Sequence, residues 1–143
     1  MNDRTKTNRV LLPLFLAFTL AQWATFGCGQ GVTRRADDAQ STSAAILAEQ
    51  AETAFRQAPR TKASVRHAYE LARTAAETSR KGSPQHYACI IQACRYAIWL
   101  SHHASPSGDG IGFASEAVAL ATRAVALQPS RAEGYYFRAI ATG

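Results

Sequence analysis

Small apolar residues, mostly alanine, recur at steps of three and four residues through most of this chain, and this spacing restricts its fold more than any other feature. In residues 42–57 the apolar positions are Ala45, Ile46, Ala48, Ala51, Ala54 and Phe55. Positions three and four apart share one face of a helix, so the spacing predicts amphipathic helices. Alanine favours helix, whereas the β-branched and aromatic residues that favour strands are sparse. The sequence therefore predicts an all-α fold.

Prolines and glycines divide the pattern into five segments. Pro59 ends the first, and residues 81–84 (Lys-Gly-Ser-Pro) end the second. Residues 105–110 form a loop, and Gln128-Pro129 separates the last two segments. The predicted helices cover residues 42–57, 61–79, 84–104, 112–127 and 130 onward. The third is apolar on nearly all sides and is expected in the middle of the bundle. Short links should make consecutive helices antiparallel hairpins.

The N-terminus has the pattern of an export signal. Residues 1–9 are polar with a net positive charge, and the 18 residues from Val10 to Gly27 contain no charged side chain. An uncleaved membrane-spanning helix is the alternative, and it needs about 20 apolar residues. The run is interrupted by Pro13 and Gln22 and is followed at once by Cys28. We therefore expect a cleaved signal peptide over residues 1–27.

The residues around Cys28 resemble a bacterial lipoprotein signal, in which a small residue precedes a cysteine that becomes diacylated. Gly27 matches that pattern, while Thr25 and Phe26 depart from it. The resemblance implies a lipid anchor on Cys28 and a place on the periplasmic face of a bacterial membrane; without the modification the protein would be secreted. Residues 28–43 are polar and lack apolar periodicity, which predicts a flexible tether. Residues 44–143 form the predicted helical domain.

The last third of the chain resembles a junction between two tetratricopeptide repeats. The matching features are Gly112, Glu116, Ala117, Ala124, Leu127, Pro129, Ala132, Glu133, Tyr135 and Ala139. The resemblance implies a right-handed stack of about five helices with a concave groove lined by the first helix of each hairpin. In that arrangement Ala117, Ala124 and Ala139 are small where helices cross closely. Pro84 and Pro129 lie 45 residues apart rather than about 34, which implies an elongated first helix in the central unit.

The final segment ends about twelve residues into its helix. By the same resemblance, a further helix would cover its apolar side, so the sequence predicts a helical domain incomplete at its C-terminus, or else a contact between copies. Either leaves Tyr135, Phe137 and Ile140 partly exposed. The signal, the irregular central hairpin and the ending AEGYYFRAIATG together resemble the T-component lipoproteins associated with tripartite periplasmic transporters. That resemblance implies an oligomeric helical protein that contacts the transporter's solute-binding subunit.

The remaining features favour a binding protein over an enzyme. The formal charge is +6, but the cations are spread among acids rather than gathered as nucleic-acid binding requires. No phosphate loop, nucleophile elbow or zinc-protease motif is present, and no metal or cofactor is expected. The candidate contact residues are Arg95, Tyr96, Trp99 and Tyr136, with core packing as the alternative for each. The predicted function is a non-catalytic scaffold for a protein or ligand in the envelope.

The histidines and cysteines leave one alternative open. His102 and His103 are adjacent, and adjacent positions point about 100° apart on a helix, which does not suit one metal ion. An enzyme that uses them would need a carboxylate beside them in the fold. Cys89 and Cys94 lie five residues apart on one predicted helix, too far apart and differently directed for a disulfide. They are expected to be buried free thiols.

Overall fold

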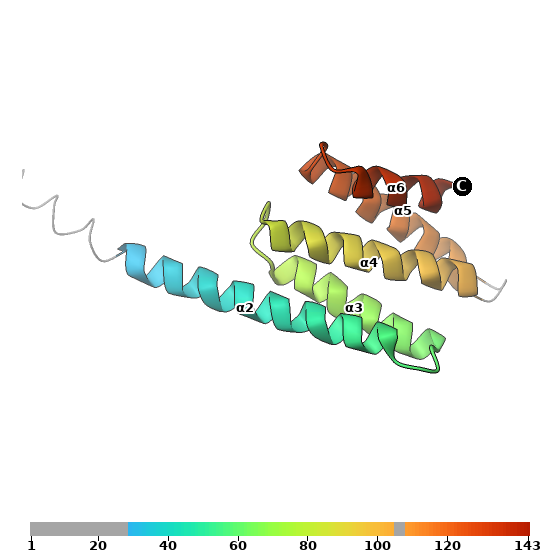
Figure 1. Cartoon of the computed structure of the whole chain (residues 1–143), viewed down its shortest axis with the longest axis horizontal. Coiled ribbons are helices and arrows are strands. Elements are labelled where there is room, and N and C mark those ends of the chain that lie inside the picture. Colours follow the sequence, from blue (N-terminus) through green and yellow to red (C-terminus); the bar gives the residue numbers. More distant parts are fainter. Residues whose placement is uncertain (1–28, 105–107) are drawn as a thin grey trace, which may run out of the picture. The chain divides into compact units, whose positions relative to one another are not determined.

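The described part of the chain forms five helices, and their ends follow local signals in the sequence. The structure is a computed structural model that describes residues 29–104 and 108–143, with side chains from residue 38 onward (Figure 1). The helices are α2 (Gly29–Arg56), α3 (Lys62–Thr78), α4 (Pro84–His103), α5 (Asp109–Leu127) and α6 (Ala132–Thr142). The described residues contain no strand. The predicted all-α fold is confirmed.

Hydrogen-bonding residues cap the N-terminal ends of two of these helices, α3 and α4. The Thr61 side chain accepts from the Ser64 amide, and the Ser64 side chain accepts from the Thr61 amide, which forms a capping box at the start of α3. The Ser83 side chain accepts from the His86 amide, and Pro84 occupies the first helical position of α4. Gly82 has a φ of 78°, a backbone conformation that favours glycine in the turn between them.

The first helix begins earlier than predicted. The sequence predicts a flexible tether over residues 28–43, whereas α2 extends back to Gly29. No proline interrupts residues 29–56, and an existing helix gains one hydrogen bond for each residue added to its end. Residues 38–43 of this segment are exposed, and apolar periodicity detects only helical residues that pack. The predicted signal peptide and the lipidation site Cys28 lie outside the described residues.

Residues 38–143 form one of the two units of the chain and are described by themselves. In this unit α4 lies between α2 and α6: its Gln92 side chain donates to the Ala48 carbonyl of α2 at 3.0 Å, and its Tyr87 hydroxyl donates to Glu133 of α6 at 3.4 Å. The other layer pairs α3 with α5, where the Tyr69 hydroxyl donates to Glu116 at 3.1 Å. The first helices of successive hairpins therefore form one row and the second helices form another.

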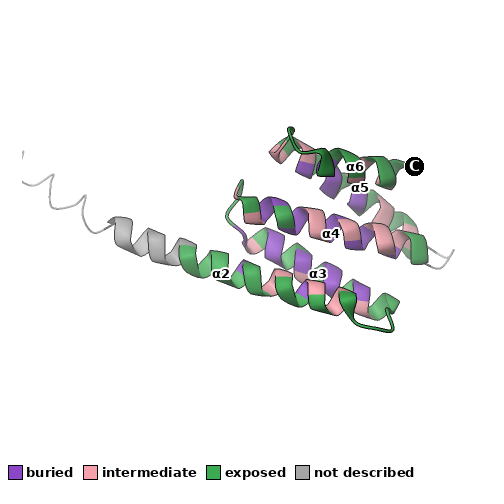
Figure 2. Ribbon diagram, viewed as in Figure 1, coloured by how far each residue is buried: buried purple, intermediate pink, exposed green. Residues whose placement is uncertain are grey.

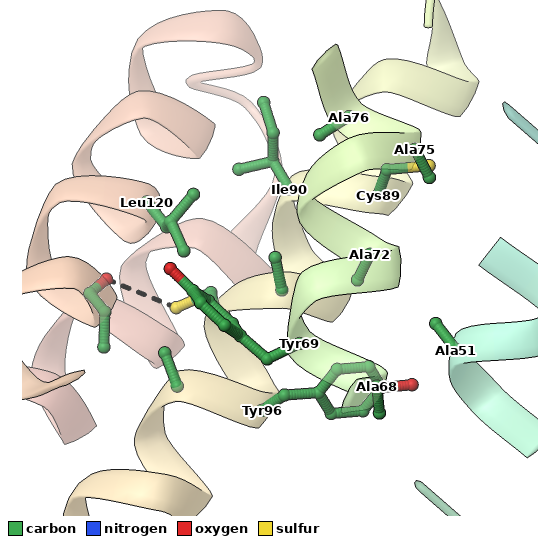
Figure 3. Packing of buried hydrophobic residues seen from close by; sticks show 14 of the residues in the cluster. Ala51, Ala68, Tyr69, Ala72, Ala75, Ala76, Cys89, Ile90, Tyr96 and Leu120 are labelled. Atoms are coloured by element: carbon green, nitrogen blue, oxygen red, sulfur yellow. Dashed lines mark hydrogen bonds between the residues drawn. The ribbon is translucent and has the colours of Figure 1, made fainter. Parts of the chain in front are cut away.

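The core is centred on α4 and built largely from alanine. Nine residues of α4 are buried, which confirms its predicted place in the middle of the bundle (Figure 2). The buried alanines of the two neighbouring helices are Ala68, Ala72, Ala75 and Ala76 of α3 and Ala117, Ala121 and Ala124 of α5. Small side chains let these helices approach closely, and α4 contributes the two largest fully buried side chains of the core, Tyr96 and Ile90 (Figure 3).

Both cysteines of α4 are buried free thiols, as predicted. The Cys94 thiol donates to the Ala117 carbonyl at 3.3 Å, so it ties α4 to α5. Burial raises the pKa of Cys94 to about 12 and also raises the pKa of Cys89. Both groups are therefore protonated at neutral pH and act as small core residues.

Helices α5 and α6 cross at a different residue from the one expected. Ala139 is predicted to lie at a close crossing, yet it is exposed, and Gly134 is the buried residue there. A Cβ atom on Gly134 would lie 3.0 Å from both Cγ2 and the amide nitrogen of Val125, so glycine allows the close approach. Tyr135 and Ile140 are partly exposed, as expected.

One helix of the described part, α5, is long and apolar enough by length and composition to cross a membrane. One of its faces packs in the core through Ala117, Leu120, Ala121 and Ala124. The other apolar side chains of α5 are half-buried or exposed, and Ile111 is 78% exposed.

Candidate functional site

A groove lies along the row formed by α2, α4 and α6, the first helices of the hairpins. Its volume is about 380 Å³, at the lower end of the range for ligand sites. The lining residues are Glu52, Tyr87, Ala88, Ile91, Gln92, Arg95, Arg131, Glu133 and Phe137. All of them belong to the unit of residues 38–143. The tetratricopeptide resemblance implies a groove on these same helices.

Glu52 of α2 is the centre of a polar network at one wall of the groove. Its carboxylate accepts hydrogen bonds from Arg56 at 2.7 Å, Tyr96 at 2.8 Å and Gln92 at 3.3 Å, and it pairs with Arg95. Burial acts to raise the pKa of Glu52, but the hydrogen bonds from Tyr96 and Arg56 and the charge of Arg95 outweigh it and lower the pKa to about 2. Glu52 is therefore ionised across the physiological range.

Arg95 extends from α4 across this network. Its Nη2 donates to Glu52 and, at 3.3 Å, to the Tyr96 hydroxyl. Its guanidinium carbon lies 5.1 Å from the centre of the Phe55 ring, within the range of a cation–π contact. The side chain keeps 41% of its surface exposed, and within the described part of the chain its buried Nε atom has no acceptor. Arg95 is thus fixed in place but only partly satisfied.

A second pair of charges closes the other wall, at the start of α6. Arg131 pairs with Glu133 at 2.8 Å, and its guanidinium carbon lies 4.7 Å from the centre of the Tyr87 ring. Burial and the charge of Glu133 raise the pKa of Tyr87, so its hydroxyl remains a donor. Between the two walls the groove is apolar, with Ala88, Ile91 and Phe137 as lining.

The four predicted contact residues do not gather in one place. Arg95 lines the groove. Tyr96 is fully buried, with its hydroxyl on Glu52 and its ring stacked on Phe55 at 4.5 Å between centres, so it is a core residue that positions the network. Trp99 is half-buried and stacks on His103, outside the groove lining. Tyr136 is 62% exposed and also lies outside the groove lining.

Several lining residues are missing from the sequence prediction, and two signals could have found them. Ala88, Ile91 or Gln92, and Arg95 recur at three- and four-residue steps on α4, and Glu133 and Phe137 lie four apart on α6. These steps mark one face of each helix. Nothing in the sequence marks Glu52, because its role depends on residues 40 or more positions away.

The two adjacent histidines are separated by the structure. The Nδ1 atom of His103 lies 2.8 Å from the Trp99 carbonyl oxygen. His102 lines a different hollow of about 410 Å³ at the ends of α4, α5 and α6, and no acidic side chain belongs to its lining. Across residues 29–104 and 108–143, no group of three or more His, Cys, Asp or Glu side chains is placed to hold a metal ion.

The groove is therefore the place where polar side chains from three helices converge around an apolar floor. Such a combination is typical of binding sites. Comparison of the chain with models of protein families, with curated proteins and with solved structures gave no match.

Proposed function

We propose that the protein is a non-catalytic binding scaffold of the bacterial envelope, and that the groove of α2, α4 and α6 holds a segment of a partner protein. The observation that carries the proposal is the Arg95–Glu52 network, which fixes a partly exposed guanidinium at the wall of an apolar groove. A side chain that is already ordered loses little conformational freedom when a partner binds. Arginine and aromatic residues are also the types that contribute most at protein interfaces.

The place of action rests on the N-terminal sequence. The charge-free run from Val10 to Gly27, followed by Cys28, supports export and anchoring by acyl chains on that cysteine. The resemblance to T-component lipoproteins suggests the solute-binding subunit of a tripartite transporter as the partner. Together these features support an accessory role in envelope transport.

The groove is tested by recovering partners from solubilised membranes with the tagged full-length protein. Ala88 is exposed and lines the groove, so Ala88→Glu places a larger, charged side chain in it while every residue that bonds Glu52 is kept. We expect Ala88→Glu and Arg95→Ala to reduce recovery of the same partner about tenfold or more. Arg80→Ala is the matched control, because Arg80 is exposed and lies outside the groove lining.

Tyr136→Ala separates the groove from the other exposed candidate contact. Because Tyr136 lies outside the groove lining, we expect this variant to leave recovery unchanged. A partner that is lost with Tyr136→Ala and kept with Ala88→Glu would place the interface on α6 and contradict the groove.

The anchor is tested by mass spectrometry of the mature N-terminus and by fractionation of cells. Acyl chains on Cys28 and release of Cys28→Ser from the membrane fraction are the expected results. Recovery of a mature chain that still carries residues 1–27 would contradict the signal-peptide assignment.

A further inference from the structure

The charges that line the groove cancel in pairs. Its lining contains two arginines and two glutamates, and each arginine is paired with a glutamate: Arg95 with Glu52 and Arg131 with Glu133. Glu52 also accepts from Arg56, Gln92 and Tyr96, so its carboxylate is already well supplied with donors. An acidic or basic ligand would have to compete with these pairs. The groove therefore offers little net attraction to a charged ligand.

The groove still has hydrogen-bonding capacity on α4. The hydrogen bonds that Arg95 donates leave from Nη2, and those that Gln92 donates leave from Nε2. Within the described part of the chain, Nη1 of Arg95 and Oε1 of Gln92 have no hydrogen-bond partner. Residues three apart are neighbours on a helix surface, so the side chains that carry this donor and this acceptor are neighbours at this wall.

This pair matches the main chain of an extended peptide. A residue in a strand presents its N–H and its C=O on the same side, where they can bond one acceptor and one donor. Successive side chains of a strand point to opposite faces. A peptide bound in this way at Gln92 and Arg95 would turn alternate side chains toward Ile91 and Phe137, which are half-buried and apolar.

We infer that the occupant of the groove is an uncharged, extended peptide segment with apolar side chains, held through its main chain by Gln92 and Arg95. The inference rests on the proposed binding function and adds the chemistry of the partner segment. Acidic and basic segments are disfavoured, because the lining arginines and glutamates already neutralise one another.

The test is a binding titration of the purified full-length protein with short, fluorescently labelled peptides whose ends are acetylated and amidated. One degenerate set contains Leu, Ile, Phe, Ser and Thr, and two further sets replace half of these positions with Asp and Glu or with Lys and Arg. We expect the uncharged set to bind at least about tenfold more tightly than either charged set. Its affinity should change by less than about twofold between low and high salt.

Arg95→Lys separates groove binding from nonspecific adsorption. Lysine keeps the positive charge beside Glu52 but lacks the forked guanidinium donors. The expected result is roughly fivefold weaker binding of the uncharged set, the size of one hydrogen bond. Arg80→Lys should leave the affinity unchanged, since Arg80 lies outside the groove lining.

Three other outcomes would contradict the inference. Tighter, salt-sensitive binding of the acidic or the basic set that depends on Arg95 would overturn the inference and leave the groove as a binding site. Binding of the uncharged set that is equal in the natural protein and in Arg95→Lys would overturn it as well. If none of the three peptide sets shows binding that Ala88→Glu abolishes, both the inference and the proposed function of the groove are contradicted.

Discussion

Glu52 shows how much one partly buried carboxylate can organise. Four donors from α2 and α4 converge on it, and they hold Arg95, Gln92 and Tyr96 in fixed positions. Its environment also lowers its pKa to about 2, so the ionised form is the one that the fold requires. The order at the groove wall therefore depends on this residue.

Replacing Glu52 should weaken the fold measurably. Glu52→Gln keeps the shape of the side chain but removes the charge opposite Arg95, and we expect a loss of about 1–3 kcal/mol in the free energy of unfolding. Urea denaturation followed by circular dichroism gives this value. Glu49→Gln on the exposed side of the same helix is the control and should change stability by less than about 0.5 kcal/mol. Equal effects of the two substitutions would show that the network contributes nothing.

His86 is another residue whose pKa is changed by its environment in the fold. It is buried where α3, α4 and α5 meet, with Nδ1 2.9 Å from the Ala76 carbonyl and Nε2 3.0 Å from Nη2 of Arg123. Nδ1 therefore carries the proton, and Nε2 accepts from the guanidinium. Burial, followed by the charges of Arg123 and Lys81, lowers the pKa of His86 below its ordinary value of 6.5.

This lowered pKa gives stability that depends on pH. The unfolded chain binds a proton at His86 as pH falls below about 6.5, while the folded chain binds it only at lower pH. The stability that neutral His86 adds to the folded protein is complete above about pH 6.5. It is lost as the pH falls toward the lower pKa that His86 has in the folded protein. We expect the unfolding free energy of the natural protein to drop more than that of His86→Gln between about pH 7 and pH 5.5. Parallel pH profiles would contradict this assignment.

At the scale of the helices, capping residues and prolines determine where a helix starts and ends. The size of the side chains determines where two helices can cross closely. Thr61 and Ser83 cap α3 and α4, and their positions are readable in the sequence beside Pro59 and Pro84. The crossing of α5 and α6 depends instead on Gly134, whose missing side chain lets the two helices approach. The sequence alone pointed to Ala139, because a motif does not show which turn of a helix meets its neighbour.

Two glycines should respond to the same substitution in opposite ways. Gly134→Ala places a methyl group against Val125 and should loosen α6, whereas Gly112→Ala meets nothing within 4 Å in α5. We expect Gly134→Ala to cost about 1–3 kcal/mol through overpacking, offset by up to about 1 kcal/mol of helix propensity. Gly112→Ala should stabilise the protein by up to about 1 kcal/mol. Thermal unfolding of both variants provides the comparison, and a stabilised Gly134→Ala protein would show that the crossing is loose.

At the scale of the whole domain, the arrangement of helices predicts where the structure opens first. Helix α4 contacts α2, α3, α5 and α6, while α6 is covered by α5 and α4 on one side and leaves Tyr135, Tyr136 and Ile140 exposed. Opening α6 therefore exposes less buried surface than opening α4. Amide hydrogen exchange should be slowest in α4 and fastest, among α3 to α6, in α6. Equal protection of these helices would indicate a single cooperative unit without a weak end.

The groove is also a property of the whole domain. Glu52, Arg95 and Glu133 come from three helices, and only the stacking of the hairpins brings them to one surface. The sequence identified Arg95 as a candidate contact, but it could not separate Arg95 from Tyr96, Trp99 and Tyr136. Residues 95, 96 and 99 lie on neighbouring helical positions, and their neighbours in space decide which is buried.

The sequence by itself determined the all-α fold, the ends of four of the five described helices to within a few residues, the central place of α4 and the burial of Cys89 and Cys94. These properties depend on local periodicity, capping groups and prolines, which act within a few residues along the chain. The extension of α2 back to Gly29 is also a local property, but apolar periodicity does not report it. The tertiary structure alone decided that Gly134 replaces Ala139 at the crossing, and that Glu52 links Arg56, Gln92, Arg95 and Tyr96. These two features depend on which faces of distant helices meet, and periodicity specifies a face without naming its partner.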